Sequence, residues 1–568
     1  MAVNARYYEK PWLKFYPQNV PSTIEVPERS LPDAFDEATR KYADKTALIF
    51  HGKRISYSKL REEVDRFSTA LHELGLQKGD KLALYLLNSP QYIIAYFGAL
   101  KAGATLTAIN PVYTSIEVKH QLEDSEAKSI VCQDFFLDNV ERTGLKLKHV
   151  IMTDIGEYLP LSMKLAGRSR LGRYAKSERP SPGIFERPGY HQFQKLLKKY
   201  PANPPKIEIN PKEDIAILAY TGGTTGVPKG AMLTHYNVLA CQTQARAFRL
   251  KLEEGKEVFP AMLPFHQIYG QVSVMLNGLL IGATLILFTT PDLDEILPAM
   301  EKHRATTFFG VPPSFLFLNN HDKTGRFDWK RLKIIASGSD TLRESTIRDW
   351  ARRTGANITE CYGLTECSAL SHLSPSGRPK VGSFGVPLPN IMAAVADSET
   401  GELVAPGEIG ELLLSGPNIM KGYWKRTDDT RETLIEIDGK SWLRTGDLVK
   451  MDDEGYFFFY DRKKDMIRYN GYSVFAREIE EVLHRHPMVK AAAVLGLLDH
   501  SVGHLIKAIV VLQTGARGKV SEAEIIKHCA ENLANYKVPK IVEFRGELPK
   551  TDVGKVSHRE LREEVGAI

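Results

Sequence analysis

The segment IAILAYTGGTTGVPKG, from Ile215 to Gly230, joins a short apolar run to a loop of glycines and threonines that ends in lysine. The apolar run predicts a buried strand. Glycines let successive backbone N–H groups converge on an anion, threonine hydroxyls add donors, and Lys229 adds a positive charge. The composition therefore indicates a phosphate-binding loop that directly follows a strand.

This loop differs from the nucleotide P-loop pattern GxxxxGK[ST], which needs a glycine immediately before the lysine. Here Val227 and Pro228 separate Gly226 from Lys229. A second stretch, Gly439-Lys440-Ser441, supplies GKS, but Leu434 stands where the pattern needs its first glycine. The sequence therefore argues against a P-loop nucleotide hydrolase.

Apolar runs alternate with amphipathic stretches such as LREEVDRFSTALHELG along most of the chain. The runs are KLALYLL, KSIVC, HVIMT, AILAY, TLILF, TTFFG and KIIAS. This alternation predicts an α/β protein with largely parallel sheets. GALKAGATL and GLLIGATLI each predict a helix closed by glycine and followed by a strand, which suggests two similar βα subdomains.

The pattern changes near Tyr460. Before it, GEIGELLLSG and EGYFFFY predict short antiparallel strands. After the charged run DRKKD come a helix, two strands and a further helix: AREIEEVLHRH, VKAAAVLG, LIKAIVVLQ and SEAEIIKHCAENL. About a hundred residues with their own apolar faces predict a small C-terminal α+β domain. We place the large domain at residues 1–461 and the small one at residues 462–568.

Composition indicates a soluble globular protein, with 43% hydrophobic and 25% charged residues. The N-terminal residues contain no continuous apolar core, so they do not predict a signal peptide. The longest apolar run, Val272 to Phe288, is short for a membrane span and predicts a buried helix that leads into a buried strand. The five scattered cysteines suit a reducing, cytoplasmic compartment.

Basic residues gather in one segment. Residues 164–199 hold ten Lys/Arg and two acids, a local charge of +8 in a chain of net charge +6. Either a solvated loop or a surface for membranes or anionic ligands explains this segment. Because no recognition motif accompanies it, nucleic acid is not an expected partner.

Six further motifs accompany the phosphate-binding loop. In chain order they are LPFHQIYG (263–270), ECYGLTE (360–366), GEIGELLLSGPNIMKGYW (407–424), WLRTGDL (442–448), DRKKDMIRYNGYSV (461–474) and LPKTDVGKVSHREL (548–561). The set resembles the adenylate-forming superfamily of acyl-CoA synthetases, luciferases and peptide-synthetase adenylation domains. It is most like the medium- and long-chain fatty acid–CoA ligases, and the resemblance extends from about Leu31 to the C-terminus.

The resemblance implies an α/β fold with a large N-terminal domain, which holds two βα-layered subdomains and a small β-barrel-like subdomain. A small mobile α+β domain follows, with its hinge near Lys464. The implied activity is that of an acid–thiol ligase of the AMP-forming acyl-CoA synthetase type. The carboxylate and ATP form an acyl-adenylate and pyrophosphate, and coenzyme A then forms the thioester and releases AMP.

The resemblance also implies the residues that hold ATP. The phosphate side comprises Thr221, Gly222, Gly223, Thr224, Thr225 and Lys229. The adenosine and α-phosphate side comprises Gly338, Ser339, Tyr362, Gly363, Thr365, Asp447 and Arg462. Tyr362 offers a flat face to adenine, Asp447 binds the ribose hydroxyls, and Glu366 is the expected Mg²⁺ ligand.

For catalysis the resemblance implies Lys555, Glu366, Thr221 and His266. Lys555 bridges the substrate carboxylate and the α-phosphate during adenylation, and His266 is expected near the carboxylate. Gly471 matches the glycine that lines the thiol tunnel for coenzyme A. The chain departs from the family's usual residues at Ala476 and Ser473, and Met451 stands where some fatty-acid members carry a gating tryptophan.

Other substrates compete with a fatty acid. An amino-acid adenylation enzyme is disfavoured, because His266 and Gln267 stand where the substrate's ammonium needs a buried carboxylate. An aryl-CoA ligase or another short acid–CoA ligase remains an alternative, and luciferase activity is a rare specialisation. The basic segment fits an enzyme that collects fatty acid at the inner membrane face, and a homodimer is compatible with the resemblance.

Overall fold

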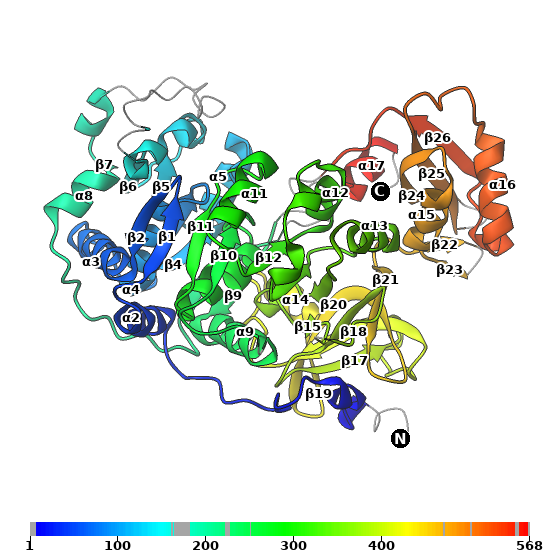
Figure 1. Ribbon diagram of the computed structural model, residues 1–568, viewed down its shortest axis with the longest axis horizontal. Coiled ribbons are helices and arrows are strands. Elements are labelled where there is room, and N and C mark those ends of the chain that lie inside the picture. The colour runs from blue at the N-terminus through cyan, green and yellow to red at the C-terminus, as the bar shows by residue number, and fades with distance from the viewer. Residues whose placement is uncertain are drawn as a thin grey trace.

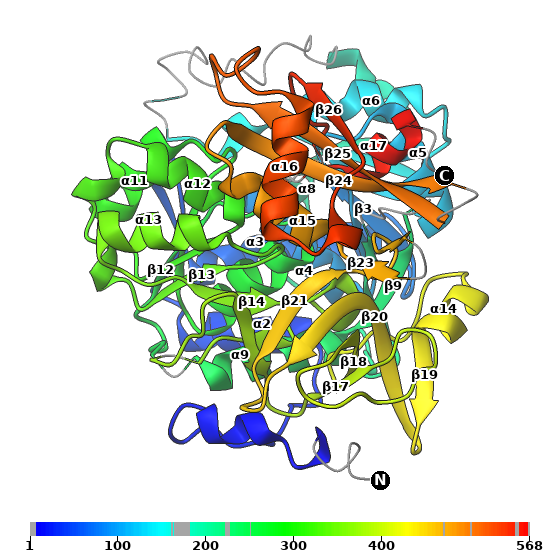
Figure 2. The ribbon, with the colours of Figure 1, turned by 90° about the vertical axis from the view of Figure 1, so that its right-hand side faces the viewer.

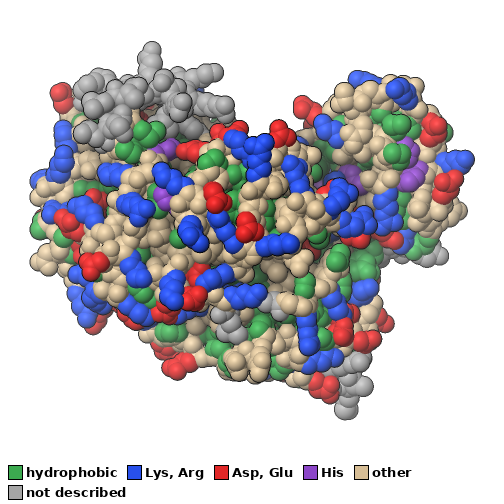
Figure 3. All heavy atoms as spheres, in the orientation of Figure 1, with side chains coloured by type: hydrophobic (Ala, Val, Ile, Leu, Met, Phe, Trp, Pro, Cys, Tyr) green, Lys and Arg blue, Asp and Glu red, His purple; other side chains and the backbone are tan. Residues whose placement is uncertain are grey.

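The computed structural model shows a large α/β body with a smaller C-terminal lobe at its side (Figure 1). It describes residues 7–160, 163, 182–221, 228–249, 251–375, 377–469, 472–499, 503–550 and 556–565. Figure 3 shows a notch in the surface between the body and the lobe. In Figure 2 the N-terminal helical turn Pro11–Phe15 lies at the opposite end of the molecule from the lobe.

A seven-stranded sheet carries the strand that precedes the phosphate-binding loop. Its order is β7-β6-β5-β3-β4-β8-β9, parallel as far as β8, and β9 then returns antiparallel to β8. The bounds are Lys81–Tyr85 (β3), Thr105–Ala108 (β4), Ser129–Gln133 (β5), His149–Thr153 (β6), Tyr190–Gln192 (β7), Ile215–Tyr220 (β8) and Gly230–Thr234 (β9). The predicted parallel sheet is confirmed here.

A four-stranded sheet of order β10-β11-β1-β2 lies beside the first, and its first three strands are parallel. Its strands are Thr46–Phe50 (β1), Lys53–Ser56 (β2), Val258–Ala261 (β10) and Thr284–Leu287 (β11). The helix α4 (Pro90–Lys101) is buried over nearly its whole length, because it packs within the main core that both sheets share. This burial explains why α4 is apolar on every side.

The third sheet changes from parallel to antiparallel along its length. Strands β12 (Thr307–Gly310), β13 (Ile334–Ser337) and β14 (Thr359–Tyr362) are parallel. The antiparallel strands are His372–Leu373 (β15), Ser383–Pro387 (β16), Met392–Ala396 (β17), Ile409–Ser415 (β18), Leu434–Ile437 (β19), Lys440–Met451 (β20) and Phe457–Arg462 (β21). Because β14 pairs with β15, the antiparallel part predicted as a β-barrel-like subdomain continues directly from the parallel part.

Helices cover the sheets. In the body they are Leu31–Lys41 (α2), Tyr57–Glu73 (α3), Ser115–Ser125 (α5), Leu137–Arg142 (α6), Phe193–Lys199 (α8), His235–Phe248 (α9), Asn277–Leu280 (α10), Leu293–Lys302 (α11), Pro312–Asn320 (α12), Glu344–Thr354 (α13) and Thr427–Thr433 (α14). None of the helices in the described part of the chain has both the length and the apolar character that crossing a bilayer requires.

Local sequence explains where the helices begin and end. The Thr234 hydroxyl accepts a hydrogen bond from the Asn237 backbone N–H and so caps α9 directly after β9. The two predicted helix–glycine–strand repeats are confirmed. Gly103, with φ +79°, lies between α4 and β4, and Gly282, with φ +76°, lies between α10 and β11. Both glycines adopt the left-handed conformation that ends a helix at low cost.

The C-terminal lobe contains a separate five-stranded sheet and its own cores. Its strands are Ile467–Tyr469 (β22), Tyr472–Val474 (β23), Val489–Asp499 (β24), Gly503–Leu512 (β25) and Ile541–Arg545 (β26). Its helices are Ala476–Arg485 (α15), Glu522–Asn532 (α16) and His558–Val565 (α17). The predicted helix–strand–strand–helix order is present, whereas the domain boundary between residues 461 and 462 stays a prediction.

Candidate active site

The phosphate-binding loop is held at both ends by the β8–β9 pair. Tyr220 is paired with Gly230, and the Thr221 backbone N–H donates to the Lys229 carbonyl at 3.0 Å. The antiparallel pairing therefore brings the two ends of the loop together. Four predicted phosphate-binding residues lie outside the described residues: Gly222, Gly223, Thr224 and Thr225.

The Lys229 ammonium is already paired. It forms an ion pair with Asp429 of α14 and lies 5.4 Å from the centre of the Tyr423 ring. Both side chains of the ion pair are about one-third exposed, at 39% and 32%. Such a pair contributes only about 0–1 kcal/mol, so a phosphate can replace Asp429 as the partner of Lys229 at low cost.

Tyr362 and Arg462 are the last residues of β14 and β21, and Asp447 lies within β20, so the fold brings the three residues together. The Tyr362 hydroxyl donates to Asp447 Oδ2 at 2.6 Å, and Arg462 Nε lies 2.8 Å from Asp447 Oδ1. The register of β20 and β21 places Asp447 directly opposite Arg462. The structure thus joins three of the predicted nucleotide-binding residues, although they are far apart in the sequence.

The Asp447 carboxylate is the centre of this group. Its side chain is fully buried, whereas that of Arg462 is 42% exposed. The Asp447 charge raises the pKa of the Arg462 guanidinium, and burial followed by the Asp447 charge raises that of Tyr362 well above its usual value. The carboxylate is therefore held by two protonated donors, in an orientation set by the sheet.

Gly338 and Gly363 are glycines because the backbone passes close to other groups. A Cβ at Gly338 would lie 2.6 Å from Cys361 Sγ and 3.0 Å from Tyr269 Cζ, and a Cβ at Gly363 would lie 1.9 Å from the Ala369 carbonyl oxygen. Ser339, which follows Gly338, has φ +70°. The loop after β13 thus packs against the end of β14, which carries Tyr362.

Glu366 lies in a short helical turn, Thr365–Cys367, immediately after the loop that carries Gly363. Its Oε1 accepts a hydrogen bond from the Tyr423 hydroxyl at 2.6 Å. Tyr423 also contacts Lys229 through its ring, so the predicted metal ligand and the phosphate-loop lysine share one neighbour. Tyr423 therefore links Glu366 and Lys229 on the predicted phosphate side of the nucleotide site. The motif analysis did not single out Tyr423.

The donor set at Glu366 fits magnesium only in part. Among the described residues, no group of three or more His, Cys, Asp or Glu side chains could hold a metal ion. Mg²⁺ commonly binds through one or two carboxylates together with substrate phosphates, and a half-buried carboxylate beside a phosphate loop suits that arrangement. Bound there, Mg²⁺ would neutralise charge on the phosphates.

His266 lies half-buried in the loop that precedes α10. Burial lowers the pKa of its imidazole to about 4, so the ring is neutral at pH 7. The chain then forms a π-helical segment, Gly270–Leu276, an element that often occurs at functional sites. The sequence predicted a buried helix from Val272 onward but not its π-helical form, which begins at Gly270. A Cβ there would lie 2.3 Å from the Pro264 carbonyl oxygen, so glycine allows the helix to fold back on the loop.

The lobe contacts the body beside the loop that contains Gly338. Arg477 of α15 donates from Nη1 to Thr341 Oγ1 at 2.6 Å, and Arg343 Nη2 lies 2.8 Å from His484 Nε2. Lys464, the predicted hinge residue, is exposed in the turn between β21 and β22. Two predicted residues of the lobe, Gly471 and Lys555, lie outside the described residues.

Met451 is 1% exposed and is paired with Phe457 within the main core. Its burial is consistent with a packing role.

The site residues that the motif analysis missed are Tyr423 and Asp429, which complete the surroundings of Glu366 and Lys229. Tyr423 lies within the quoted KGYW stretch, so the sequence did mark the segment but not its contacts.

Known families and proteins are similar to this chain over most of its length. The family described as AMP-binding enzyme matches residues 35–424, and its C-terminal domain matches residues 478–555. A long-chain-fatty-acid–CoA ligase of Bacillus subtilis is 36% identical over 98% of both chains, and one of Escherichia coli O157:H7 is 38% identical over 98% of both. A 4-coumarate–CoA ligase-like 9 of Oryza sativa is 31% identical over 97% of this chain and 94% of its own.

Solved structures show the same fold. ATP-bound MatB from Rhodopseudomonas palustris aligns with a TM-score of 0.82 and 27% identity over 94% of this chain and 99% of that chain. A long-chain-fatty-acid-CoA ligase from Archaeoglobus fulgidus aligns with a TM-score of 0.67 and 25% identity over 93% of this chain and 99% of that one. The predicted resemblance is confirmed: the chain belongs to the AMP-binding enzyme family.

Proposed function

We propose that this protein is an ATP-dependent fatty acid–CoA ligase. The observation that carries the proposal is the assembly of Tyr362, Asp447 and Arg462 around one buried carboxylate, beside a phosphate-type loop. Relatives named long-chain-fatty-acid–CoA ligase, similar over nearly the whole chain, support a fatty acid as the substrate. Substrates of the reaction are the acid, ATP and coenzyme A.

The reaction proceeds in two steps. A carboxylate oxygen of the acid attacks the α-phosphorus of ATP, the bond to the β-phosphate oxygen breaks, and pyrophosphate leaves. The thiol of coenzyme A then attacks the acyl carbon of the adenylate, and AMP leaves as the thioester forms. Two anions must approach each other in the first step, so the site must place positive groups and donors where charge develops.

The described residues fit these demands. Tyr362 and Asp447 would bind the adenosine part, with Arg462 as a second contact, while Thr365 would reach the α-phosphate. Thr221 and Lys229 would hold the departing phosphates, and Glu366 would hold Mg²⁺ against them. His266, neutral at pH 7, is suited to donate or accept a hydrogen bond near the carboxylate rather than to supply charge.

A substrate screen tests the proposal. We expect aliphatic acids to release pyrophosphate in the presence of ATP and to yield a thioester and AMP when coenzyme A is added. The screen includes short, medium and long aliphatic acids, coumarate and amino acids, each with and without coenzyme A. Preference for coumarate would favour the aryl alternative, which the Oryza sativa relative supports by its name. Pyrophosphate exchange with amino acids alone would overturn the proposal.

We further propose that the basic segment, residues 164–199, holds the enzyme at an anionic membrane surface, with the enzyme otherwise in the cytoplasm. Neutralising Arg168, Arg170, Arg173 and Lys176 is expected to weaken sedimentation with anionic vesicles, because each basic residue near such a surface contributes about 1 kcal/mol. These four residues lie outside the described residues. Activity on soluble acids should stay unchanged, and vesicle binding equal to that of the wild type would contradict the proposal.

A homodimer is a further proposal, and sedimentation of the purified chain at several concentrations tests it directly. A mass that stays that of a single chain at every concentration would reject it.

A further inference from the structure

Arg249 is a buried cation for which the described residues supply no counter-charge. It follows α9 and is 8% exposed, and its Nη1 and Nη2 atoms are shielded from solvent with no hydrogen-bond partner among the described residues. Its guanidinium lies 4.9 Å from the centre of the Phe309 ring. A cation–π contact compensates only part of the cost of burying a charge, so the guanidinium lacks the partner that a buried cation needs.

Three neighbours of Arg249 could in principle supply a negative charge. They are Tyr269, Cys361 and Cys241, and each interacts electrostatically with the guanidinium. Burial raises the pKa of each group, well above the usual value for Tyr269 and to about 12 for Cys241, so all three are neutral at pH 7. None of these described neighbours therefore supplies a counter-charge, which leaves that role to a molecule that binds.

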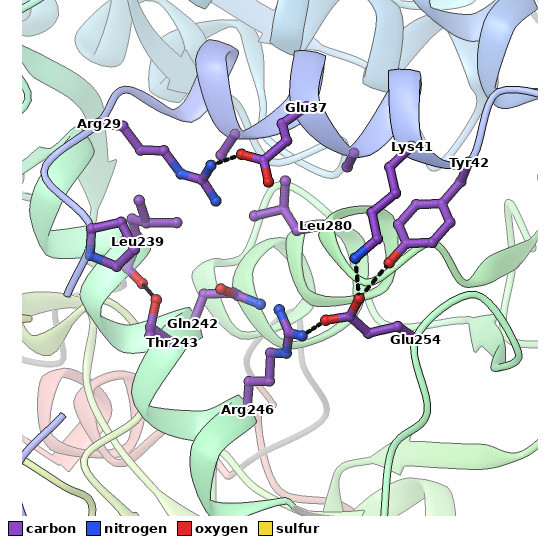
Figure 4. A pocket seen from close by; sticks show the side chains of 13 residues that line it. Arg29, Glu37, Lys41, Tyr42, Leu239, Gln242, Thr243, Arg246, Glu254 and Leu280 are labelled. Carbon is purple, nitrogen blue, oxygen red and sulfur yellow. Dashed lines mark hydrogen bonds and ion pairs between the residues drawn. The ribbon is translucent and has the colours of Figure 1, made fainter. Parts of the chain in front are cut away.

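The basic residues nearby are paired. Figure 4 shows a pocket along α2 and α9 in which Arg246, one turn before Arg249, forms an ion pair with Glu254. Lys41 and the Tyr42 hydroxyl also bind Glu254, and Arg29 forms an ion pair with Glu37. Arg246 and Arg249 thus lie at the same end of α9. Arg246 is paired with a carboxylate, whereas the Arg249 guanidinium has no such partner among the described residues.

The position of Arg249 links it to the predicted active site. Its neighbour Tyr269 lies in the LPFHQIYG motif, three residues after His266, and the Tyr269 hydroxyl is 3.5 Å from Cys361 Sγ. Cys361 directly precedes Tyr362, and both Tyr269 and Cys361 press against Gly338, where a Cβ would collide with them. The guanidinium therefore lies beside the motif that contains His266, which is expected near the reacting carboxylate.

We propose that Arg249 binds a second carboxylate, at the far end of the acid, and that the preferred substrates are α,ω-dicarboxylic acids. One carboxylate reacts with ATP near His266 while the other accepts hydrogen bonds from the guanidinium. Arginine suits this task because its planar group binds a carboxylate through two parallel hydrogen bonds. The inference rests on the proposed function and specifies its substrate class.

Matched acid series test the inference. Monocarboxylic, ω-hydroxy and α,ω-dicarboxylic acids of equal length, from short to long, are compared by kcat/KM with the wild-type full chain. We expect the diacid of best length to exceed its monoacid by about tenfold or more, since a charged hydrogen-bonded pair is worth about 1.5–3 kcal/mol. Equal use of both acids at every length would overturn the inference without touching the proposed ligase function, which fails only if no acid is converted.

Variants of Arg249 then test whether this residue causes the preference for diacids. Arg249→Met is expected to reverse the preference, raising KM for the diacid at least tenfold and leaving kcat for the monoacid close to that of the wild type. Arg249→Lys should retain part of the diacid preference because it keeps the charge. Arg246→Met serves as the matched control, because its guanidinium is paired with Glu254 and not with substrate. An unchanged preference in Arg249→Met, or an equal change in Arg246→Met, would overturn the assignment.

Variants that fold poorly do not weaken the test. The wild-type protein should show a larger thermal stabilisation by the diacid than by the monoacid at equal concentration, since a ligand stabilises the state that it binds. Equal stabilisation by both acids would count against the inference as clearly as equal turnover.

Discussion

Replacing Lys555 with alanine is expected to nearly abolish adenylate formation while sparing thioester formation from a supplied acyl-adenylate. The expectation rests on the match of TDVGKVS to the family motif, because Lys555 lies outside the described residues. In the first step a carboxylate approaches an α-phosphate, and a lysine that bridges the two offsets their repulsion where charge develops. The second step starts from a mixed anhydride and a thiol, so it does not need that bridge.

The size of the loss follows from the role of the lysine. Removal of one preorganised donor at a developing charge costs about a hundredfold to a thousandfold in kcat. Pyrophosphate release from ATP and acid measures the first step, and thioester formation from synthetic acyl-adenylate and coenzyme A measures the second. The two assays use the same purified variant, so a folding defect would lower both.

Lys550→Ala is the matched control. Lys550 is exposed, lies five positions before Lys555 in the sequence, and forms a backbone bridge with Val556. Truncating its side chain leaves that backbone bridge in place, and both half-reactions should proceed at wild-type rates. Equal loss of both steps in Lys555→Ala would refute the assignment of this lysine to adenylation.

Much of the fold could be predicted because local patterns and buried faces agree. Each apolar run between KLALYLL and KIIAS became a strand, and the predicted buried segment from Val272 to Phe288 contains the π-helical segment, α10 and β11. Gly103 and Gly282 mark the ends of two similar helices because a left-handed residue is needed there. These features depend on residues that are close together in the sequence, so the sequence alone is enough to predict them.

The contacts that complete the site could not be predicted in the same way. Tyr423 binds Glu366 across 57 positions, and Asp429 pairs with Lys229 across 200 positions. Such pairs depend on how β14, β9 and α14 are packed, not on local composition. That no described residue partners the Arg249 guanidinium is harder still to predict, since the absence of a contact depends on how all the surrounding elements pack.

Replacing Asp447 with asparagine is expected to raise KM for ATP by about ten- to a hundredfold. The variant keeps the shape of the side chain and still accepts a hydrogen bond from the Tyr362 hydroxyl, but it removes the charge that pairs with Arg462. Hydrogen bonds to charged groups contribute about 1.5–3 kcal/mol each, and the ribose contacts and the orientation of Arg462 both depend on this carboxylate.

Tyr362→Phe separates the two halves of the Asp447 contact. It removes the hydroxyl that donates to Asp447 Oδ2 but keeps the ring, which stacks against Phe384 at 4.4 Å between ring centres. We expect a smaller rise in KM for ATP than in Asp447→Asn, because the carboxylate and Arg462 stay paired. Steady-state kinetics with ATP as the varied substrate, together with direct titration of ATP, provides both measurements.

A structural role alone would give a different result for Asp447. Because Asp447 is fully buried within the sheet, its replacement could lower the melting temperature and with it the active fraction, which would reduce kcat and leave KM for ATP unchanged. A nucleotide-binding role instead raises KM and abolishes the thermal stabilisation that ATP gives to the wild type. An Asp447→Asn variant that melts early yet binds ATP with wild-type affinity would therefore remove Asp447, and with it the Tyr362–Asp447–Arg462 group, from the nucleotide site.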